Sequence, residues 1–483
     1  MSKLGRANVE AIYPLSPLQE GMLFHSLYEP GSDLYVNRFA CRLAGADPRA
    51  LRGAWERLVA RHPILRTTFL WQELERPLQV VHREVELPWR DLDWTDADPN
   101  DPADDWRRRA GDLLASEDFS GFDLARPPLE RLACARLAGG DLAMVWSHHH
   151  ILLDGWSLGL LLAELLALHD DLAAGREPSL PPARGFGDFI SWLERRDDAD
   201  AEATWRRHLE GFAAATALPF DRRAGNGSPE LAVVERVLAP AATGELEALV
   251  RRHRLTLSTL VQAAWGLLLA RHAGSEDVAF GVTVAGRPTE LPGAERIAGL
   301  FINTLPVRLA VPAGETVGAW LTQVQERLVE LRRHEHLPLV RVQGWSEVAA
   351  GDPLFESVVV FENYPGADEA GQPGGATVAD VLSAESTHYP LTLQAGTAEG
   401  GEGTRLALKL AHDRRRVDDA AAAELVGQLS TLLAAMAADD GARLADLPLT
   451  PPAELAQTVA GWNATARPYA VETTLSARIE AQA

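Results

Sequence analysis

Residues that could do chemistry are concentrated in one short stretch, 147–159, with the sequence SHHHILLDGWSLG. The stretch contains two overlapping patterns. His149 to Gly155 reads His-His-x-x-x-Asp-Gly, which suggests an acyl transfer assisted by a histidine. Gly155 to Gly159 reads Gly-x-Ser-x-Gly, the pattern of a hydrolase whose Ser157 would form a covalent acyl-enzyme. The two patterns predict different reactions, so the surrounding elements have to decide between them.

The expected elements favour the histidine pattern. A hydrolase serine lies on a sharp turn directly after a strand, whereas the strand here is expected to end near residue 147, well before Ser157. Ser157 is expected at a helix start, where serine is a preferred cap. The strand would deliver His149 and His150 to its end, a loop would carry Asp154 and Gly155, and the helix N-terminus would favour a developing oxyanion. This arrangement predicts direct attack of a bound nucleophile on a bound acyl group.

Two alternatives stay open on the residues alone. A serine hydrolase would need a later histidine, and His334, His336, His388 and His412 all follow. The histidines could also simply close a strand beside the core, with their ring nitrogens satisfied by backbone groups. Evidence from the rest of the sequence has to decide between these alternatives.

Composition excludes several classes of function. The 483 residues suggest two to four domains, and 46% hydrophobic with 24% charged residues indicates a well-buried globular core. The net charge of −22 argues against binding to nucleic acid or to an anionic membrane. Only Lys3 and Lys409 are lysines, so arginine dominates the basic residues. The arginine run 414–416 is flanked by aspartates, and we expect a solvated helix face there.

Cysteine usage and hydropathy indicate a reduced cytoplasmic setting. Cys41 and Cys134 belong to no metal or disulfide pattern, so no metal site is expected. The first residues lack the apolar core of a signal peptide. The longest uncharged apolar stretch, 255–270, is too short and too polar to span a bilayer.

The predicted elements form two mixed halves. The expected organisation is an N-terminal linker over 1–10, a first half over 11–178, a second half over 179–450 and a connector over 451–483. Residues 127–150 predict a β-hairpin with a glycine turn, and 157–173 predict an apolar helix. The Pro-rich segment 175–185 is the best inner boundary. The fold class is therefore expected to be α/β (α+β), with two similar halves.

Six segments in order resemble the motifs of the condensation domains of nonribosomal peptide synthetases. The resemblance covers roughly residues 11 to 450. The tail GWNATARPYAVETTLSARIEAQA resembles a linker that enters an adenylation domain. The six segments are LSPLQEGMLF, RHPILRTTF, SHHHILLDGWS, FGDFISWL, IAGLFINTLPVR and HEHLPLVRVQ.

The resemblance implies a fold, partners and residue roles. The family fold is two chloramphenicol-acetyltransferase-like subdomains in a V, with a tunnel between them. Upstream donor and downstream acceptor carrier proteins dock at its mouths, and their phosphopantetheine arms bring the substrates together, so no intrinsic cofactor is expected. The resemblance makes His150 the catalytic histidine and leaves open whether it acts as a base or positions the amine.

Further roles follow from the same resemblance. Asp154 is expected to pair with Arg66 and hold the loop, Gly155 leaves room and supplies an N–H, and His149 and Ser157 are structural. The expected tunnel residues are Trp156, Asn303, Thr304 and Tyr389.

Departures from the family pattern keep alternatives in view. The segment AESTHYPLTL lacks the arginine that many relatives carry in their last motif. The segments SPLQEGMLFHSL and LFESVVVFENYP resemble the subtype that takes a donor ending in a D-residue. An epimerisation-type relative and a non-catalytic carrier-docking or recruitment module on the same fold stay open. Heterocyclisation relatives carry a DxxxxD pattern in place of the His-His motif that this chain keeps, and the DFGWG segment of plant acyltransferases is not found.

Overall fold

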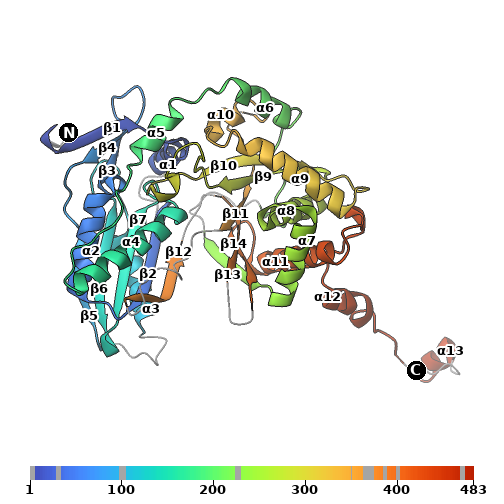
Figure 1. Ribbon diagram of the computed structural model, residues 1–483. Helices are drawn as coiled ribbons and strands as arrows, with labels where there is room; N and C mark the ends of the chain where they lie inside the picture. The colour runs from blue at the N-terminus through green and yellow to red at the C-terminus, as the bar shows by residue number, and fades with distance from the viewer. Residues whose placement is uncertain are drawn as a thin grey trace.

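The computed structural model describes residues 6–28, 34–96, 105–222, 230–349, 351–362, 375–384, 389–398, 403–467 and 474–483. This part of the chain forms two lobes that lie side by side, each a β-sheet with helices against it (Figure 1). The architecture confirms the expected α/β class with two mixed halves. His388 and the end of the segment 354–365, both considered above, lie outside the described residues.

The first lobe is built on a five-stranded sheet in the order β12-β2-β7-β6-β5. Its central strand β7 is buried along its whole length. Helices α2 and α4 pack together on one face, where the rings of Trp55 and Trp146 lie 4.9 Å apart, and α3 packs on the other. A smaller sheet of order β1-β4-β3 adjoins this lobe. The elements are β1 (Val9–Pro14), α1 (Pro17–Tyr28), β2 (Val36–Ala44), α2 (Pro48–Arg61), β3 (Thr67–Leu70), β4 (Leu78–His82), β5 (Trp89–Trp94), α3 (Trp106–Leu114), β6 (Glu130–Leu137), β7 (Leu142–His149), α4 (Gly155–Ala173) and β12 (Thr377–Ala384).

The second lobe carries a six-stranded sheet in the order β10-β9-β11-β13-β14-β8. Helices α7, α8, α9 and α11 share its hydrophobic core with the sheet (Figure 1). The elements from α5 onward are α5 (Gly187–Leu193), α6 (Ala199–Leu209), β8 (Leu231–Val237), α7 (Pro240–His253), α8 (Leu257–Ala273), β9 (Asp277–Val284), β10 (Asn303–Ala310), α9 (Val317–Arg332), α10 (Leu339–Gln343), β11 (Ser357–Glu362), β13 (Leu391–Ala398), β14 (Arg405–Asp413), α11 (Asp419–Ala438), α12 (Pro452–Ala456) and α13 (Leu475–Glu480).

The expected division of the chain at residue 178 does not separate the two cores. Phe189, Ile297 and Phe301 follow that boundary and yet pack in the core of the first lobe. Strand β12 pairs antiparallel with β2 and so extends the sheet of the first lobe. The physical reason is that the outer edge of β2 has backbone groups that need a partner, and a strand from the second half supplies them. The N-terminal linker is also shorter than expected, because β1 begins at Val9.

Local signals in the sequence correspond to the observed turns and caps. Ser16 and Gln19 form a capping box, the Ser-x-x-Gln pattern of a helix start, with the Ser16 N–H donating to Gln19 Oε1 at 2.9 Å. The β6–β7 hairpin turns at Gly139 and Gly140, whose φ values of 86° and 93° suit glycine. Helix α8 ends at Gly274 in the left-handed conformation, as its C-terminal glycine predicts.

One helix of the described chain, α11, is long and apolar enough by length and composition to cross a membrane. Half of that stretch is buried inside the second lobe, where Leu425, Leu429 and Leu432 belong to the hydrophobic core. This burial gives α11 the character of a core helix.

Candidate active site

His150 lies in the turn that follows β7, immediately before the loop that leads to α4. Its backbone N–H donates to the carbonyl of Tyr35 at 2.7 Å, and its Nδ1 lies 2.6 Å from the carbonyl oxygen of Leu153. Because a carbonyl can only accept, Nδ1 carries the ring proton and Nε2 keeps its lone pair. The half-buried imidazole therefore presents a basic nitrogen in a fixed orientation.

His149 is buried and has its ring orientation set by the backbone. The Ile151 N–H donates to its Nδ1 at 3.2 Å, and its Nε2 lies 3.4 Å from the Ser26 hydroxyl. Burial, and secondly the neighbouring His150, lowers the pKa of His149 to about 3. This side chain stays neutral, which supports the expected structural role.

Asp154 is the N-cap of α4 and the centre of a clamp between the two halves of the chain. Its Oδ1 accepts from the Ser157 N–H at 2.8 Å, and its Oδ2 accepts from the Phe301 N–H at 3.0 Å. Arg287 Nη2 donates to Oδ1 at 3.1 Å, and both side chains are almost fully buried. The carboxylate therefore holds the active-site loop against residues 299–301 of the second half.

The predicted pairing of Asp154 with Arg66 is wrong. Arg66 donates instead to Glu10 Oε2 at 2.7 Å and to the carbonyls of Val59, at 3.0 Å, and His82. It ties the end of α2 to β4 and β1. The sequence contained Arg287, but nothing marked it as the partner, because it lies 133 positions from Asp154 and only the crossing loop brings it close.

Arg287 is a site residue that the sequence reasoning missed. Its Nη1 donates to the carbonyls of Ala294 and Ile297, at 2.6 and 2.8 Å. Its guanidinium carbon lies 4.0 Å from the ring centroid of Phe301 and 5.5 Å from that of Trp156. Burial lowers the pKa of Arg287, and Asp154 opposes that effect.

The hydroxyl of Ser157 forms hydrogen bonds with Gly299 and Arg287. Its hydroxyl donates to the Gly299 carbonyl at 2.8 Å and accepts from the Gly299 N–H at 3.0 Å and from Arg287 at 2.9 Å. The side chain is completely buried. Ser157 is thus not the cap that we expected, since Asp154 occupies that position, and its geometry does not fit a hydrolase nucleophile. Gly155, the first residue of α4, leads the backbone from the cap into the helix.

The four expected tunnel residues fall into two groups. Asn303 and Thr304 begin β10, and a hydrogen bond with Thr304 lowers the pKa of Tyr389 while burial, the larger effect, raises it. Asn303 also lines a small cavity between the lobes, together with Leu18, Phe189, Phe301 and Glu335. Trp156 lies apart from this group, stacked near Arg287, and its indole N–H donates to the Glu295 carbonyl at 2.9 Å.

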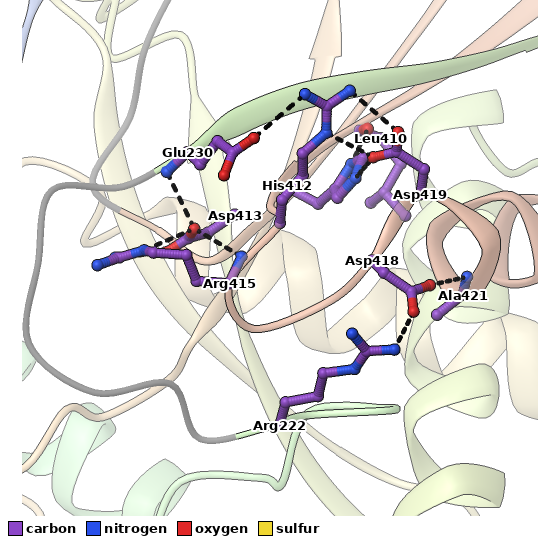
Figure 2. A network of polar contacts seen from close by, with 10 residues as sticks. Arg222, Glu230, Leu410, His412, Asp413, Arg415, Asp418, Asp419 and Ala421 are labelled. Atoms are coloured by element: carbon purple, nitrogen blue, oxygen red, sulfur yellow. Dashed lines mark hydrogen bonds and ion pairs between the residues drawn. The ribbon is translucent and has the colours of Figure 1, made fainter.

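The arginine run 414–416 is not the solvated helix face that we expected. It forms the turn between β14 and α11, and each arginine meets a carboxylate; Figure 2 shows Arg415 against Asp413. Arg414 pairs with Asp419 at 2.8 Å, Arg415 with Asp413 at 2.7 Å and Arg416 with Asp221 at 2.6 Å. The run therefore fastens segments of the second lobe to each other. Within the described ranges, no three His, Cys, Asp or Glu side chains lie together as a metal site would require.

Comparison with known proteins places the chain among relatives. The family model described as Condensation domain matches residues 9–459. One of the subunits of linear gramicidin synthase from Brevibacillus parabrevis is 42% identical over 476 residues, which cover 98% of this chain and 9% of that protein. Surfactin synthase subunit 3 of Bacillus subtilis (strain 168) is 32% identical over 437 residues, covering 90% of this chain and 33% of that protein. The chain thus spans only a small part of the length of these relatives.

Solved structures show the same fold. The X-domain from teicoplanin biosynthesis has a TM-score of 0.76 at 25% identity, covering 90% of this chain and 97% of that one. The starter condensation domain of rhizomide synthetase RzmA, in a mutant form, has a TM-score of 0.77 at 19% identity, covering 91% and 98%. At that identity the second similarity shows the fold alone.

Proposed function

Since the chain belongs to the condensation domain family of nonribosomal peptide synthetases, whose domains form amide bonds, we propose that it joins two carrier-bound substrates. The donor is a peptidyl or aminoacyl thioester on an upstream carrier protein. The acceptor is the amine of an aminoacyl thioester on a downstream carrier protein. The observation that carries the proposal is the orientation of His150, whose Nε2 lone pair faces away from the Leu153 carbonyl that holds Nδ1.

The reaction follows from that orientation. The acceptor nitrogen attacks the donor carbonyl carbon, the C–N bond forms, and the carbonyl oxygen becomes an oxyanion near the start of α4 at Gly155, where the helix dipole favours negative charge. The C–S bond then breaks, and the thiolate of the donor arm leaves. The proton released by the amine passes to His150 Nε2 or directly to the thiolate. Either path uses the same nitrogen of His150, as a base or as the acceptor that positions the amine.

The test is a carrier-to-carrier peptide-forming assay with three proteins. His150→Ala should lose about 10²–10⁴-fold in rate, because general acid–base assistance is removed. Ser157→Ala should keep a measurable rate, and mass spectrometry should find no acyl group on the parent protein after mixing with donor alone. Near-parental turnover by folded His150→Ala, or an acyl adduct on Ser157, would overturn the proposal.

Donor stereochemistry forms a finer part of the proposal. The motif segments 16–27 and 354–365 support a preference for a donor whose last residue is D. Inverting the donor Cα exchanges its side chain and hydrogen, so one epimer meets a wall that the other clears. A difference of about 1.4–2.8 kcal/mol corresponds to ten- to hundredfold selectivity. Single-turnover rates with matched D- and L-terminated donors and one glycyl acceptor measure it; equal rates would remove this claim and leave condensation intact.

Partners and setting follow from the relatives. These are large multidomain synthetase subunits, and one solved neighbour is a four-domain synthetase bound to AMP and glycine. We propose phosphopantetheine-bearing carriers and an adjacent adenylation domain as partners, residues 451–483 as the connector to that domain, and the cytoplasm as the location. A second solved neighbour, the teicoplanin X-domain, has also been solved in complex with OxyB. That complex is the reason for retaining protein recruitment as the alternative function. A parent protein that forms no peptide in the assay would favour recruitment.

A further inference from the structure

Glu130 is a buried acid directly beside the strand that carries the active-site histidines. It lies on β6 opposite His148 of β7, and its side chain has no exposed surface. In the part of the chain that the structure describes, neither carboxyl oxygen has a hydrogen-bond partner. The indole N–H groups of Trp55 and Trp146 approach the carboxyl closely enough to affect it, yet neither reaches good hydrogen-bond geometry.

Glu130 belongs to a polar row that crosses three neighbouring strands. The pairing registers place Asn37 of β2, His148 of β7 and Glu130 of β6 side by side, so their side chains share one face of the sheet. All three are buried, and Asn37 Oδ1 and His148 Nδ1 also lack partners among the described residues. The ring of Trp146 lies 4.5 Å from that of His148 and 4.9 Å from that of Trp55. A charge placed in this row would lie among neutral side chains.

The surroundings favour the neutral carboxyl. Burial, the largest effect, raises the pKa of Glu130 to about 8, while the two indoles and Arg131 oppose the rise. His148 is the ionisable group that faces it from β7, and burial lowers its pKa to about 3, so it does not become a counter-ion. Arg131 follows Glu130 on β6, so it points to the opposite face, where it stacks 4.8 Å from the ring of Phe122. The groups from α2 and β2, Trp55 and Asn37, do not ionise.

This row is tied to the active-site turn through the backbone. The His149 N–H donates to the carbonyl of Leu129, the residue before Glu130, at 3.1 Å. The next amide, of His150, donates to the Tyr35 carbonyl at 2.7 Å. A displacement of β6 at Glu130 is therefore passed to His149 through the hydrogen bond with Leu129, and from His149 to the adjacent His150.

We propose that Glu130 is a positioning residue for His150, because its neutral carboxyl lets the polar row pack beneath the end of β7. Loss of its proton places a charge without a counter-ion in that row, draws the indole N–H groups of Trp55 and Trp146 toward the carboxylate, and shifts the His149–His150 turn. The kinetic consequence rests on the proposed function. The structural consequence does not, so the two can fail separately.

The structural test compares the parent with Glu130→Gln between about pH 6 and pH 10, the range in which a carboxyl of raised pKa releases its proton. We expect an infrared band of a protonated carboxyl to disappear from the parent with rising pH, together with a change in tryptophan fluorescence. The ring signal of His150 in NMR spectra, assigned by its loss in His150→Ala, should move with the same midpoint. Glu130→Gln should lose the Glu130 part of the infrared change, the fluorescence change and the His150 shift that shares their midpoint, while Glu335, whose pKa burial raises to about 7, keeps its own infrared change. The exposed control Glu86→Gln should behave as the parent does. A His150 signal that moves identically in Glu130→Gln would overturn the proposal.

The kinetic test follows the ratio of the Glu130→Gln rate to the parent rate in single-turnover peptide formation, after subtraction of thioester hydrolysis. Glutamine keeps the shape without the charge, so the ratio should be near one at low pH and should rise with pH, since activity that needs a proton falls about tenfold per pH unit above its pKa. KM should not change. If Glu130→Gln does not fold, Glu130→Leu replaces it as the neutral variant. Parallel pH profiles of parent and variant would contradict the positioning role even where both are active.

Discussion

At the scale of single residues, the active site depends on which arginine meets Asp154. Arg287 and Asp154 are both almost fully buried, and each also holds backbone groups of the second half of the chain. Removal of one partner leaves the other as a buried charge without compensation, whereas removal of both partners leaves no buried charge behind. The pair is thus a structural clamp whose two members depend on each other.

We predict that Asp154→Ala or Arg287→Ala lowers the free energy of unfolding by about 3–5 kcal/mol, and that the double variant costs much less than the sum. The loss in free energy of unfolding caused by Arg66→Ala should simply add to that caused by Asp154→Ala, because Arg66 pairs with Glu10. Urea unfolding of the single and double variants gives these coupling energies. Coupling of Asp154 to Arg66 and none to Arg287 would restore the pairing that the resemblance implied.

At the scale of elements, α4 is fastened at both ends to segments of the second half. Its first turn binds residues 299–301 through Asp154 and Ser157. Near its last turn, Asp170 Oδ1 accepts from the Ala376 N–H at 3.0 Å, just before β12 begins. His169 supports this carboxylate at 2.9 Å and accepts from the Asp47 N–H at 2.8 Å. One helix therefore sets the position of both crossing segments.

Asp170→Ala should loosen β12 and leave the loop around His150 in place, because the two ends of α4 make separate contacts. The expected result is faster hydrogen exchange at residues 376–384, with unchanged exchange at 148–157, measured by mass spectrometry. Loss of one hydrogen bond to a charged group costs about 1.5–3 kcal/mol. Asp171→Ala is the matched control, since Asp171 pairs with Arg176 and not with β12. Equal exchange of β12 in both variants would show that strand pairing with β2 alone holds it.

At the scale of the whole molecule, the two lobes form one unit and the C-terminal tail stands apart from it. The tail extends away from the second lobe (Figure 1). Its large apolar side chains are exposed, with Trp462 at 69% and Leu475 at 76%. Such a segment contributes little buried surface to the stability of the lobes.

A protein that ends at residue 450 should therefore melt within about 1–2 °C of the parent and keep its rate with separately supplied carriers, because little buried contact is lost. Calorimetry and the peptide assay measure the two quantities. A large drop in melting temperature would show that the tail belongs to the folded unit, contrary to its proposed role as a connector.

The sequence by itself determined the features that depend on local chemistry. The glycine turn at Gly139 and Gly140 was predicted, and the capping box at Ser16 and Gln19 and the end of α8 at Gly274 likewise depend only on residues close in the chain. The order of the motifs likewise indicated the family and the place of His150 at the end of a strand. These features need only neighbouring residues, so single stretches of sequence contain them.

Only the tertiary structure decided the features that join distant segments. Arg287 meets Asp154, Ser157 binds Gly299, and β12 joins β2 because the second half of the chain returns to the first lobe. Many arginines in this chain could have paired with Asp154, and a net charge or a spacing does not distinguish them. Burial decides the pairing, since a buried carboxylate needs a cation and N–H donors at hydrogen-bond distance, and only the fold brings these within reach.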